Sequence, residues 1–387
     1  MAKNKRSFGR IRKLPSGRFQ ARYLGPDGVD RPAPVTFGSR RDADDWLAER
    51  QTELRRGEWR DPDAGAVNFE EYALQWVAER GLSATTDELY RRLLRLHILP
   101  TFGDVDLDSV TPPHVRTWRT ERLKETGPTT VAKSYRLLKS IFETAVDDEL
   151  LRRNPCRIRG AGKETADERP VATVDQVDAL ADALGPRWRL MVYIQAYGPA
   201  RPEEQAALRR PDVDLVRVGV WIRTAEPELC TGRRAPGDTK SAAGKRFIAL
   251  PAFLEPELRL HLELFAEKEP EGLLFVGEKG AAFRRSSFGR KWRKARGKVG
   301  LPTNFRFYDL RHTGHTISTR SGATLKDTMV RAGQSSEKAA LRYQHSNDDR
   351  QREVADGIDA YVQARRARTD GNKAALPPSG TQRARDT

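Results

Sequence analysis

The chain has 387 residues and a formal net charge of +16, and 37% of its residues are hydrophobic. This length is sufficient for two or three domains, and the apolar content excludes a wholly disordered chain. The positive charge predicts a polyanionic partner, and nucleic acid is the first candidate because phosphate binding releases counterions. A membrane surface is the weaker alternative, because the charge is spread over the whole chain and no long apolar run is present.

The N-terminus and the two cysteines give little sign of export or of a metal site. Residues 1–12 are basic but lack the apolar segment of a secretory signal, so a cytoplasmic protein is expected. Cys156 and Cys230 are far apart and have no partners at metal-binding spacing. We expect them to be ordinary buried or half-buried thiols.

Residues 1–63 are predicted to form a small three-stranded sheet backed by one helix. Segments 8–12 and 19–23 alternate apolar and basic residues around a turn, and residues 35–37 are a candidate third strand. Ser39 is expected to cap a helix that continues through residue 56. Basic residues on neighbouring strands favour a DNA groove reader over a solvated hairpin without a target. The candidate DNA-binding residues are Arg10, Arg12, Arg18 and Arg22.

Residues 67–157, after a linker at 61–65, are predicted to form four helices with basic outer faces. The expected helices start near residue 69, span 86–99 up to Pro100, open at Thr111, and span 129–151 up to the Asn154-Pro155 stop. In the last helix the apolar residues share one face. The other face carries three candidate DNA-binding residues, Lys133, Arg136 and Lys139. Taken alone, this pattern fits any small helical bundle.

The largest predicted domain covers residues 168–365 and follows a second Gly-containing linker at 160–165. Helices are expected at 173–184, 188–197, 203–209 and 251–267, and strands at 218–223, 246–250 and 273–276. The rest is expected to be mostly helical, and the tail 366–387 disordered. The fold class is therefore multidomain and mainly α with small β-sheets: a three-stranded sheet plus helix, a helical bundle, and a mixed α+β domain.

Several segments of this last domain occur in a particular order and spacing: residues 196–208, residues 239–241, residues 308–313 and residues 332–345. They resemble the first arginine box, the β-hairpin lysine, the second arginine box, and the closing histidine and nucleophile boxes of tyrosine recombinases of the phage integrase kind. The mixed α+β domain is then similar to the catalytic domain of that family. Residues 67–157 resemble its core-binding helical domain, and residues 1–63 its arm-binding sheet. The resemblance, to three-domain members of actinobacterial type, covers nearly the whole chain.

The resemblance implies that DNA is cleaved through a covalent 3′-phosphotyrosine. Tyr343 would be the nucleophile, Arg201 and Arg311 would bind the non-bridging oxygens, and Lys240 would protonate the departing 5′ oxygen. Rejoining would then need no ATP, metal or other cofactor. Each residue also has an ordinary structural interpretation. Lys240 in particular lies in a Lys/Arg-rich loop where a solvated lysine is usual, and Lys245 competes with it.

Tyr308 and Gln334 are the positions where this chain departs from the family pattern. The family most often has histidine where Tyr308 stands, and histidine or tryptophan where Gln334 stands. Both side chains can hydrogen-bond, but neither is a good base near neutral pH. His312, next to Arg311, could partly compensate for the missing base at these two positions. His312 and His315, three residues apart, could in principle share a metal ion, but no metal site is expected because no second cluster of ligands accompanies them.

The sequence therefore predicts a site-specific recombinase that integrates or excises a phage or mobile element. Four protomers would clamp two duplex sites and exchange strands through a Holliday junction, with the N-terminal sheet on separate arm sites. An accessory bending or directionality protein is a further candidate partner, and no membrane is expected. Two alternatives remain at this point. One is a DNA-binding regulator that has lost catalysis, and the other is a type IB topoisomerase-like enzyme.

Overall fold

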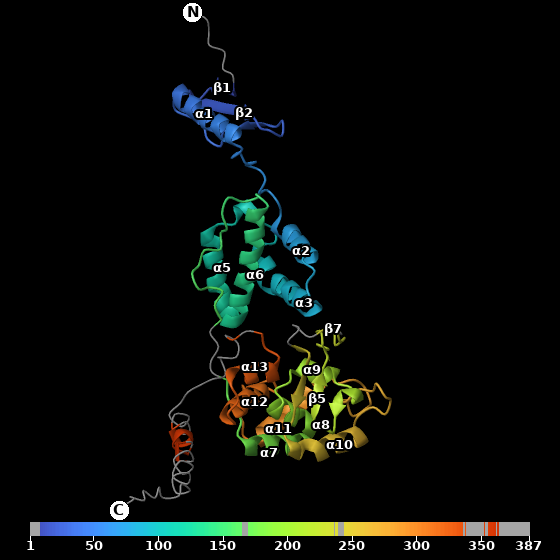
Figure 1. Ribbon diagram of the computed structural model, residues 1–387. Coiled ribbons are helices and arrows are strands. Elements are labelled where there is room, and N and C mark those ends of the chain that lie inside the picture. The colour runs from blue at the N-terminus through green and yellow to red at the C-terminus, as the bar shows by residue number, and fades with distance from the viewer. Residues whose placement is uncertain are drawn as a thin grey trace, which may run out of the picture. The chain divides into compact units, whose positions relative to one another are not determined.

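The computed structural model describes residues 8–164, 169–235, 237–238 and 244–335, and also residues 337, 352, 355–360 and 362–363. Lys240, Tyr343 and the tail from residue 366 lie outside these residues. The chain divides into two compact units, residues 1–167 and 168–387 (Figure 1). Helices predominate and the sheets are small, which confirms the predicted fold class. Among the described helices, none combines the length and the apolar content needed to span a bilayer.

The first unit begins with an antiparallel sheet of β1 (Arg10–Lys13), β2 (Phe19–Leu24) and β3 (Asp30–Pro32), packed on helix α1 (Arg40–Arg56). Ala21 and Tyr23 of β2 are buried together with Ala43 and Leu47 of α1. Ser39 caps α1 as predicted, because its side chain accepts a hydrogen bond from the Asp42 N–H at 3.1 Å. The core thus fixes which face of the sheet is left for other contacts.

The third strand of this sheet is not where the sequence predicted it. Residues 35–37 contribute only an isolated bridge between Phe37 and Phe19, and β3 lies at residues 30–32 instead. Gly28, at φ +78°, permits a tight turn that returns the chain directly beside β2. Pro32 and Pro34 lack the N–H donors that would extend the new strand.

A helical bundle completes the first unit, and aromatic side chains form much of its core. Phe69, Phe102, Trp118 and Phe142 are buried, and the centroids of their contacting rings are 5.4–6.0 Å apart. The helices are α2 (Phe69–Glu79), α3 (Ala84–Leu93), α4 (Leu99–Phe102), α5 (Pro112–Glu125) and α6 (Pro128–Asp147).

Two helix ends in this bundle differ from the prediction. Pro100 does not end the second helix, because a π-helical turn at Leu94–Ile98 widens the backbone and the chain continues as α4. A π turn relieves the clash between a proline ring and the carbonyl of the preceding turn. Helix α6 ends at Asp147 rather than Leu151, since Glu149 adopts a left-handed conformation at φ +63°.

The second unit is built around the buried helix α8 (Pro186–Tyr197). It also contains α7 (Val174–Leu184), α9 (Pro202–Ala207), α10 (Glu255–Leu264), α11 (Arg285–Lys298), α12 (Asp309–Arg320) and α13 (Leu325–Ala332). Strands β4 (Val213–Asp214), β5 (Gly219–Ile222) and β8 (Arg246–Ala249) form one antiparallel sheet. Strands β6 (Thr224–Ala225) and β7 (Gly237–Asp238) form a separate pair.

Three predictions for this unit were wrong in detail. Residues 273–276 form only isolated bridges, because the neighbouring chain turns into a short 3₁₀ helix at Arg210–Asp212 and cannot extend a ladder. Helix α9 stops at Ala207, since Leu208 and Arg209 after it adopt extended backbone conformations. Cys156 is buried as expected, but Cys230 is exposed in the connection between β6 and β7.

Close packing of α12 against α8 depends on a glycine. A Cβ atom on Gly314 would lie 2.7 Å from the carbonyl oxygen of Ala196, closer than van der Waals contact allows. The glycine therefore lets α12 approach the C-terminal end of α8. This approach brings the start of α12, with Arg311, against the segment that leads from α8 to Arg201.

Candidate active site

Arg201 is held at the start of α9 by the carboxylate of Glu204. The Arg201 backbone N–H donates to Oε2 of Glu204 at 2.7 Å, and its Nη1 donates to Oε1 at 2.6 Å. Pro202 occupies the first turn of α9, where its missing N–H costs no helical hydrogen bond. The Arg201 side chain is mostly buried, at 18% relative exposure. Its guanidinium is therefore fixed before any ligand binds.

Arg311, in the first turn of α12, is fully buried. Its Nη1 donates to the carbonyl oxygen of Pro199, 112 residues away in the sequence. Its Nη2 donates to the carbonyl oxygen of Ala332 at 2.5 Å. Its Nε has no hydrogen-bond partner among the described residues. Burial lowers the pKa of Arg311 to about 10, which leaves the guanidinium charged at neutral pH.

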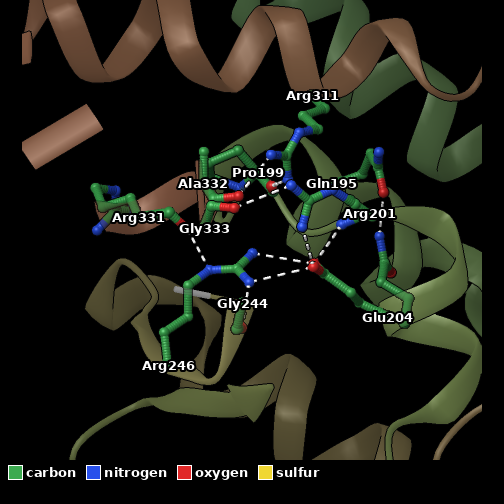
Figure 2. Close-up of polar contacts among 11 residues, drawn as sticks. Gln195, Pro199, Arg201, Glu204, Gly244, Arg246, Arg311, Arg331, Ala332 and Gly333 are labelled. Carbon is green, nitrogen blue, oxygen red and sulfur yellow. Dashed lines mark hydrogen bonds and ion pairs between the residues drawn. The ribbon is translucent and has the colours of Figure 1, made fainter. Parts of the chain in front are cut away.

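The backbone at the end of α13 contacts both Arg201 and Arg311. Gly333, at φ +60°, ends this helix in the left-handed conformation typical of a helix C-terminus. Carbonyl oxygens at a helix C-terminus carry partial negative charge, which favours cations. The carbonyl oxygens of residues 331, 332 and 333 accept hydrogen bonds from Arg246 Nε (2.8 Å), Arg311 Nη2 (2.5 Å) and Arg201 Nη2 (3.0 Å), in that order (Figure 2).

Sequence reasoning missed the partners that complete this cluster, Glu204 and Arg246. Arg246, the first residue of β8, donates from Nη1 and Nη2 to the Glu204 carboxylate at 3.2 and 3.0 Å. Burial by itself would raise the pKa of Glu204, but its hydrogen bonds with Arg246 and the neighbouring charges lower the pKa below its ordinary value. Arg246 begins the otherwise apolar segment 246–250, which was an available signal, whereas Glu204 stands between Glu203 and Gln205 and gave no such signal.

Gln334 directly follows the carbonyl that Arg201 contacts. Its backbone N–H donates to the Met329 carbonyl oxygen at 3.0 Å, which closes the turn after α13. Its side-chain Oε1 is buried and accepts no hydrogen bond within the described part of the chain. Because a buried amide oxygen without a donor is costly, this oxygen is a candidate for contact with a ligand donor.

Tyr308 precedes α12 and stays partly accessible, at 39% relative exposure. Its ring makes an edge contact with the His312 ring at a centroid distance of 5.7 Å. The predicted tyrosine therefore begins the second arginine segment and keeps part of its side chain accessible.

The histidines of α12 are kept neutral. Burial, together with the nearby positive charges of Arg169 and Arg311, lowers the pKa of His312 to about 4. Burial and Arg311 lower the pKa of His315 to about 3. An imidazole with so low a pKa is a weak base near pH 7. The described residues contain no cluster of three or more His, Cys, Asp or Glu that could hold a metal ion.

Lys240 and Tyr343 lie outside the described residues, so the structure does not test their predicted roles. The described chain after Lys240 and the described chain before Tyr343 both lead to the arginine cluster. Before Arg246, the Gly244 carbonyl oxygen accepts a hydrogen bond from Arg246 Nη1 at 2.8 Å. Ahead of Tyr343, α13 ends at the carbonyls that contact the arginines.

The basic residues of the N-terminal sheet share one face. Arg10 lies opposite Arg22 in the β1–β2 register, and Arg12 opposite Gln20, on the face away from α1. Asp30 accepts hydrogen bonds from Arg10 at 2.5 Å and from Arg22 at 2.8 Å. Arg18, just before β2, donates to the Thr36 hydroxyl at 2.7 Å. Three of the four candidates thus form one surface, and a carboxylate partly neutralises two of them.

The three candidate DNA-binding residues on α6 differ in how far their charges are paired with a carboxylate. Arg136 donates to the Gly162 carbonyl oxygen at 2.8 Å and to Glu164 at 2.5 Å. Lys133 lies 3.9 Å from the same carboxylate. Lys139 is exposed. The carboxylate of Glu164 therefore reduces the positive charge that two of these residues present.

A further basic surface, on α11, was not among the predicted DNA contacts. The helix packs through Phe288, Trp292 and Ala295, which are buried in the core of the second unit. Its exposed basic residues are Arg285, Arg290, Arg293, Lys294 and Lys298. The alternation of basic pairs with apolar residues over 290–298 was a visible signal of such a helix.

Comparison with known proteins places most of the chain in three matched segments. Residues 7–56 match the model of the phage integrase N-terminal domain, residues 69–161 the phage integrase central domain, and residues 170–350 the phage integrase family. The chain is 39% identical over 361 residues to the putative prophage phiRv2 integrase of Mycobacterium tuberculosis. The aligned region covers 91% of this chain and 95% of that protein.

Two solved structures share the fold at low sequence identity. The Tn1549 transposon integrase in complex with transposon right end DNA matches with a TM-score of 0.65 at 19% identity, over 76% of this chain and 100% of that chain. A lambda integrase tetramer bound to a Holliday junction matches with a TM-score of 0.56 at 16% identity, over 90% of this chain and 99% of that chain.

Proposed function

The chain belongs to the phage integrase family of site-specific tyrosine recombinases, and on this premise we propose how its residues share the cleavage and rejoining of DNA. The observation that carries the proposal is the arginine cluster. Arg201 and Arg311 come from distant segments and contact consecutive carbonyl oxygens at the end of α13. Two fixed guanidinium groups side by side form a site for the non-bridging oxygens of one phosphodiester.

Both arginines keep donors available for such a phosphate. A guanidinium has five N–H donors, and the carbonyls and Glu204 use only part of them. The buried Nε of Arg311 is without an acceptor in the described residues. The backbone contacts therefore orient the two guanidinium groups, and a phosphoryl oxygen would complete their hydrogen bonding.

The reaction then needs a nucleophile and an acid, which we assign to Tyr343 and Lys240. The Tyr343 hydroxyl loses its proton to solvent as its oxygen forms a bond to phosphorus, the bond from phosphorus to the 5′ oxygen breaks, and Lys240 gives that oxygen a proton. The 3′-phosphotyrosine keeps the bond energy, and attack by a 5′ hydroxyl of the partner strand reverses the step. Tyr308 hydrogen-bonds the phosphate in place of the family's usual histidine, and the Gln334 amide N–H does so in place of its usual histidine or tryptophan.

The three parts of the chain divide DNA binding among them. We assign residues 1–63 to arm-type sites through Arg10, Arg12, Arg18 and Arg22. Residues 67–157 would bind the core site through Lys133, Arg136 and Lys139, and residues 168–365 would carry the chemistry. The exposed basic side chains of α11 add phosphate contacts to the last part.

Recombination joins two duplexes, so we propose that four copies of the chain act together on two sites. The tetrameric lambda integrase bound to a Holliday junction, which shares this fold, supports that arrangement. A bending or directionality protein is proposed as an accessory partner that sets the direction of reaction. We place the reaction in the cytoplasm of a bacterial host, because the chromosomal and element DNA that it would join is there.

A nicked suicide duplex tests the proposal. Its core sequence is read from the junctions between the element and its host chromosome. The wild-type chain should form a protein–DNA adduct that survives SDS, and Tyr343→Phe should bind the same duplex without forming the adduct. Wild type that binds its own site but never forms the adduct would favour a regulator that only occupies sites, and would overturn the proposed chemistry.

A further inference from the structure

Arg246 is a buried arginine that the chemistry above leaves without a role. It is 8% exposed and begins strand β8. Its guanidinium donates four hydrogen bonds to three segments of the second unit (Figure 2). Nη1 and Nη2 donate to Glu204, Nη1 also donates to Gly244, and Nε donates to the Arg331 carbonyl oxygen. These four bonds use four of the five N–H donors and fix the position of the charge.

The charge of Arg246 matters because of its contact with Glu204. Its carboxylate is 1% exposed and contacts Arg201 and Arg246 at once. If Arg246 were absent, the buried negative charge would be balanced by Arg201 alone. Because charges interact strongly away from water, the attraction of Arg201 for a phosphate would then be largely cancelled. With Arg246 present, the group of three carries a net charge of +1.

Arg246 also contacts the same helix end as the other two arginines. Its Nε bonds to the carbonyl of residue 331, and the next two carbonyls orient Arg311 and Arg201. Arg331 itself is tied to α8, since its Nη2 donates to the Tyr197 carbonyl oxygen at 2.8 Å. A shift of this turn would therefore move the contacts of both phosphate-binding arginines together.

We propose that Arg246 is a positioning residue of the active site, which neutralises Glu204 so that Arg201 keeps its positive charge for the scissile phosphate. Its bond to the end of α13 holds Arg201 and Arg311 in their shared arrangement. The inference rests on the proposed function, because it takes Arg201 as a ligand of that phosphate. A purely structural ion pair is the alternative, and it makes a different prediction when both partners are changed.

The test measures the single-turnover rate of adduct formation by the full chain on the nicked suicide duplex. Arg246→Met keeps the length of the side chain but removes its charge, and should slow the adduct about a hundredfold, as loss of a charge-stabilising contact does. Adding Glu204→Gln to that variant removes the unbalanced carboxylate and keeps an acceptor for Arg201. The double variant should recover at least about tenfold over Arg246→Met.

Arg246→Lys is the matched variant that keeps the positive charge, and it should cleave within about tenfold of wild type. Circular dichroism melting and non-covalent binding to the unnicked duplex establish that each variant is folded. If Arg246→Met does not fold, the cleavage rate of Arg246→Lys becomes the test. An Arg246→Lys rate as low as that of Arg201→Ala would overturn the inference.

Arg246→Met at the wild-type rate, or a double variant no faster than Arg246→Met, would mean that the pair is structural only. Absence of an adduct from wild type itself would instead overturn the proposed function, and the inference with it.

Discussion

Arg311 Nη2 donates to the carbonyl oxygen of Ala332 at 2.5 Å, so α12 is tied directly to the last turn of α13. This contact joins the second arginine segment to the turn that leads to Gln334. Since the same turn also receives Arg201, the distance between the two guanidinium groups is set by backbone atoms. As the proposed phosphate site, this arrangement would be organised before DNA binds, which would lower the cost of holding the phosphate in the productive position.

Arg311→Lys should separate charge from geometry at this contact. A lysine keeps one positive charge but cannot bridge the Pro199 and Ala332 carbonyls and a phosphate at the same time. We expect the single-turnover rate of adduct formation to fall about a hundredfold, with non-covalent DNA binding almost unchanged. Arg320→Lys, at the exposed end of the same helix, is the control. An Arg311→Lys chain as fast as wild type would contradict the assigned role.

Gln334 should contribute through one hydrogen bond to the phosphate. Gln334→Ala removes the side-chain amide whose Nε2 would donate to a phosphoryl oxygen, and it should slow adduct formation about tenfold, equivalent to ~1.4 kcal/mol. Ser335→Ala, at the exposed next position, should leave the rate unchanged. If both variants match wild type, Gln334 has no role in cleavage.

The packing of α12 on α8 gives a stability prediction. Gly314→Ala places a Cβ atom 2.7 Å from the Ala196 carbonyl oxygen, so the helices must move apart, at a cost of about 1–3 kcal/mol in the free energy of unfolding. Gly297→Ala, in the open on α11, should be neutral or stabilise by up to ~1 kcal/mol. Urea unfolding of both variants measures the difference, and equal midpoints would refute the packing argument.

His315 should make the second unit sensitive to acid. Its pKa lies near 3 in the folded chain because of burial and Arg311, below the ordinary value of 6.5. Between these two values the unfolded chain binds a proton that the folded chain does not, so stability falls as the pH falls. From pH 7 to pH 5 this site should cost about 2 kcal/mol. His315→Gln should lose that much less stability over the same interval in urea titrations, and an unchanged pH dependence would contradict this.

The parts of the fold that could be predicted from sequence are those fixed by local chemistry. Ser39 and Thr173 cap their helices through contacts three residues away, and apolar spacing located the bundle. The π turn before Pro100 and the position of β3 depend on tertiary packing that no local pattern records. Helix ends were correspondingly the least accurate part of the prediction.

The site was predictable only where family motifs are continuous in sequence. Arg201 and Arg311 were identified in their boxes, and the structure brings both to one helix end. The pairing of Glu204 with Arg246 joins residues 42 positions apart, and neither periodicity nor spacing predicts such a contact. A buried ion pair becomes visible only after the segments that surround it have been packed.

In the N-terminal sheet, removing one acidic side chain should strengthen DNA binding. Asp30 accepts hydrogen bonds from Arg10 and Arg22 on the face proposed to bind arm-type DNA. Asp30→Asn removes the carboxylate that competes with DNA phosphates for these arginines, and affinity for arm-site duplex should rise a few-fold with a steeper salt dependence. Arg12→Ala should weaken binding and reduce the salt slope by about one, because the exposed guanidinium of Arg12 donates to the uncharged Gln20 side chain at 3.3 Å and keeps its charge for a phosphate.

Asp45→Asn is the matched control for Asp30→Asn, because it removes the same charge from an exposed position on α1, behind the sheet. Fluorescence anisotropy with labelled arm-site duplex at several salt concentrations measures all three variants. If both asparagine variants raise the affinity equally, the gain comes from net charge alone. An increase confined to Asp30→Asn means that the face with Arg10 and Arg22 lies against the DNA, since only there does the lost carboxylate stand between arginine and phosphate.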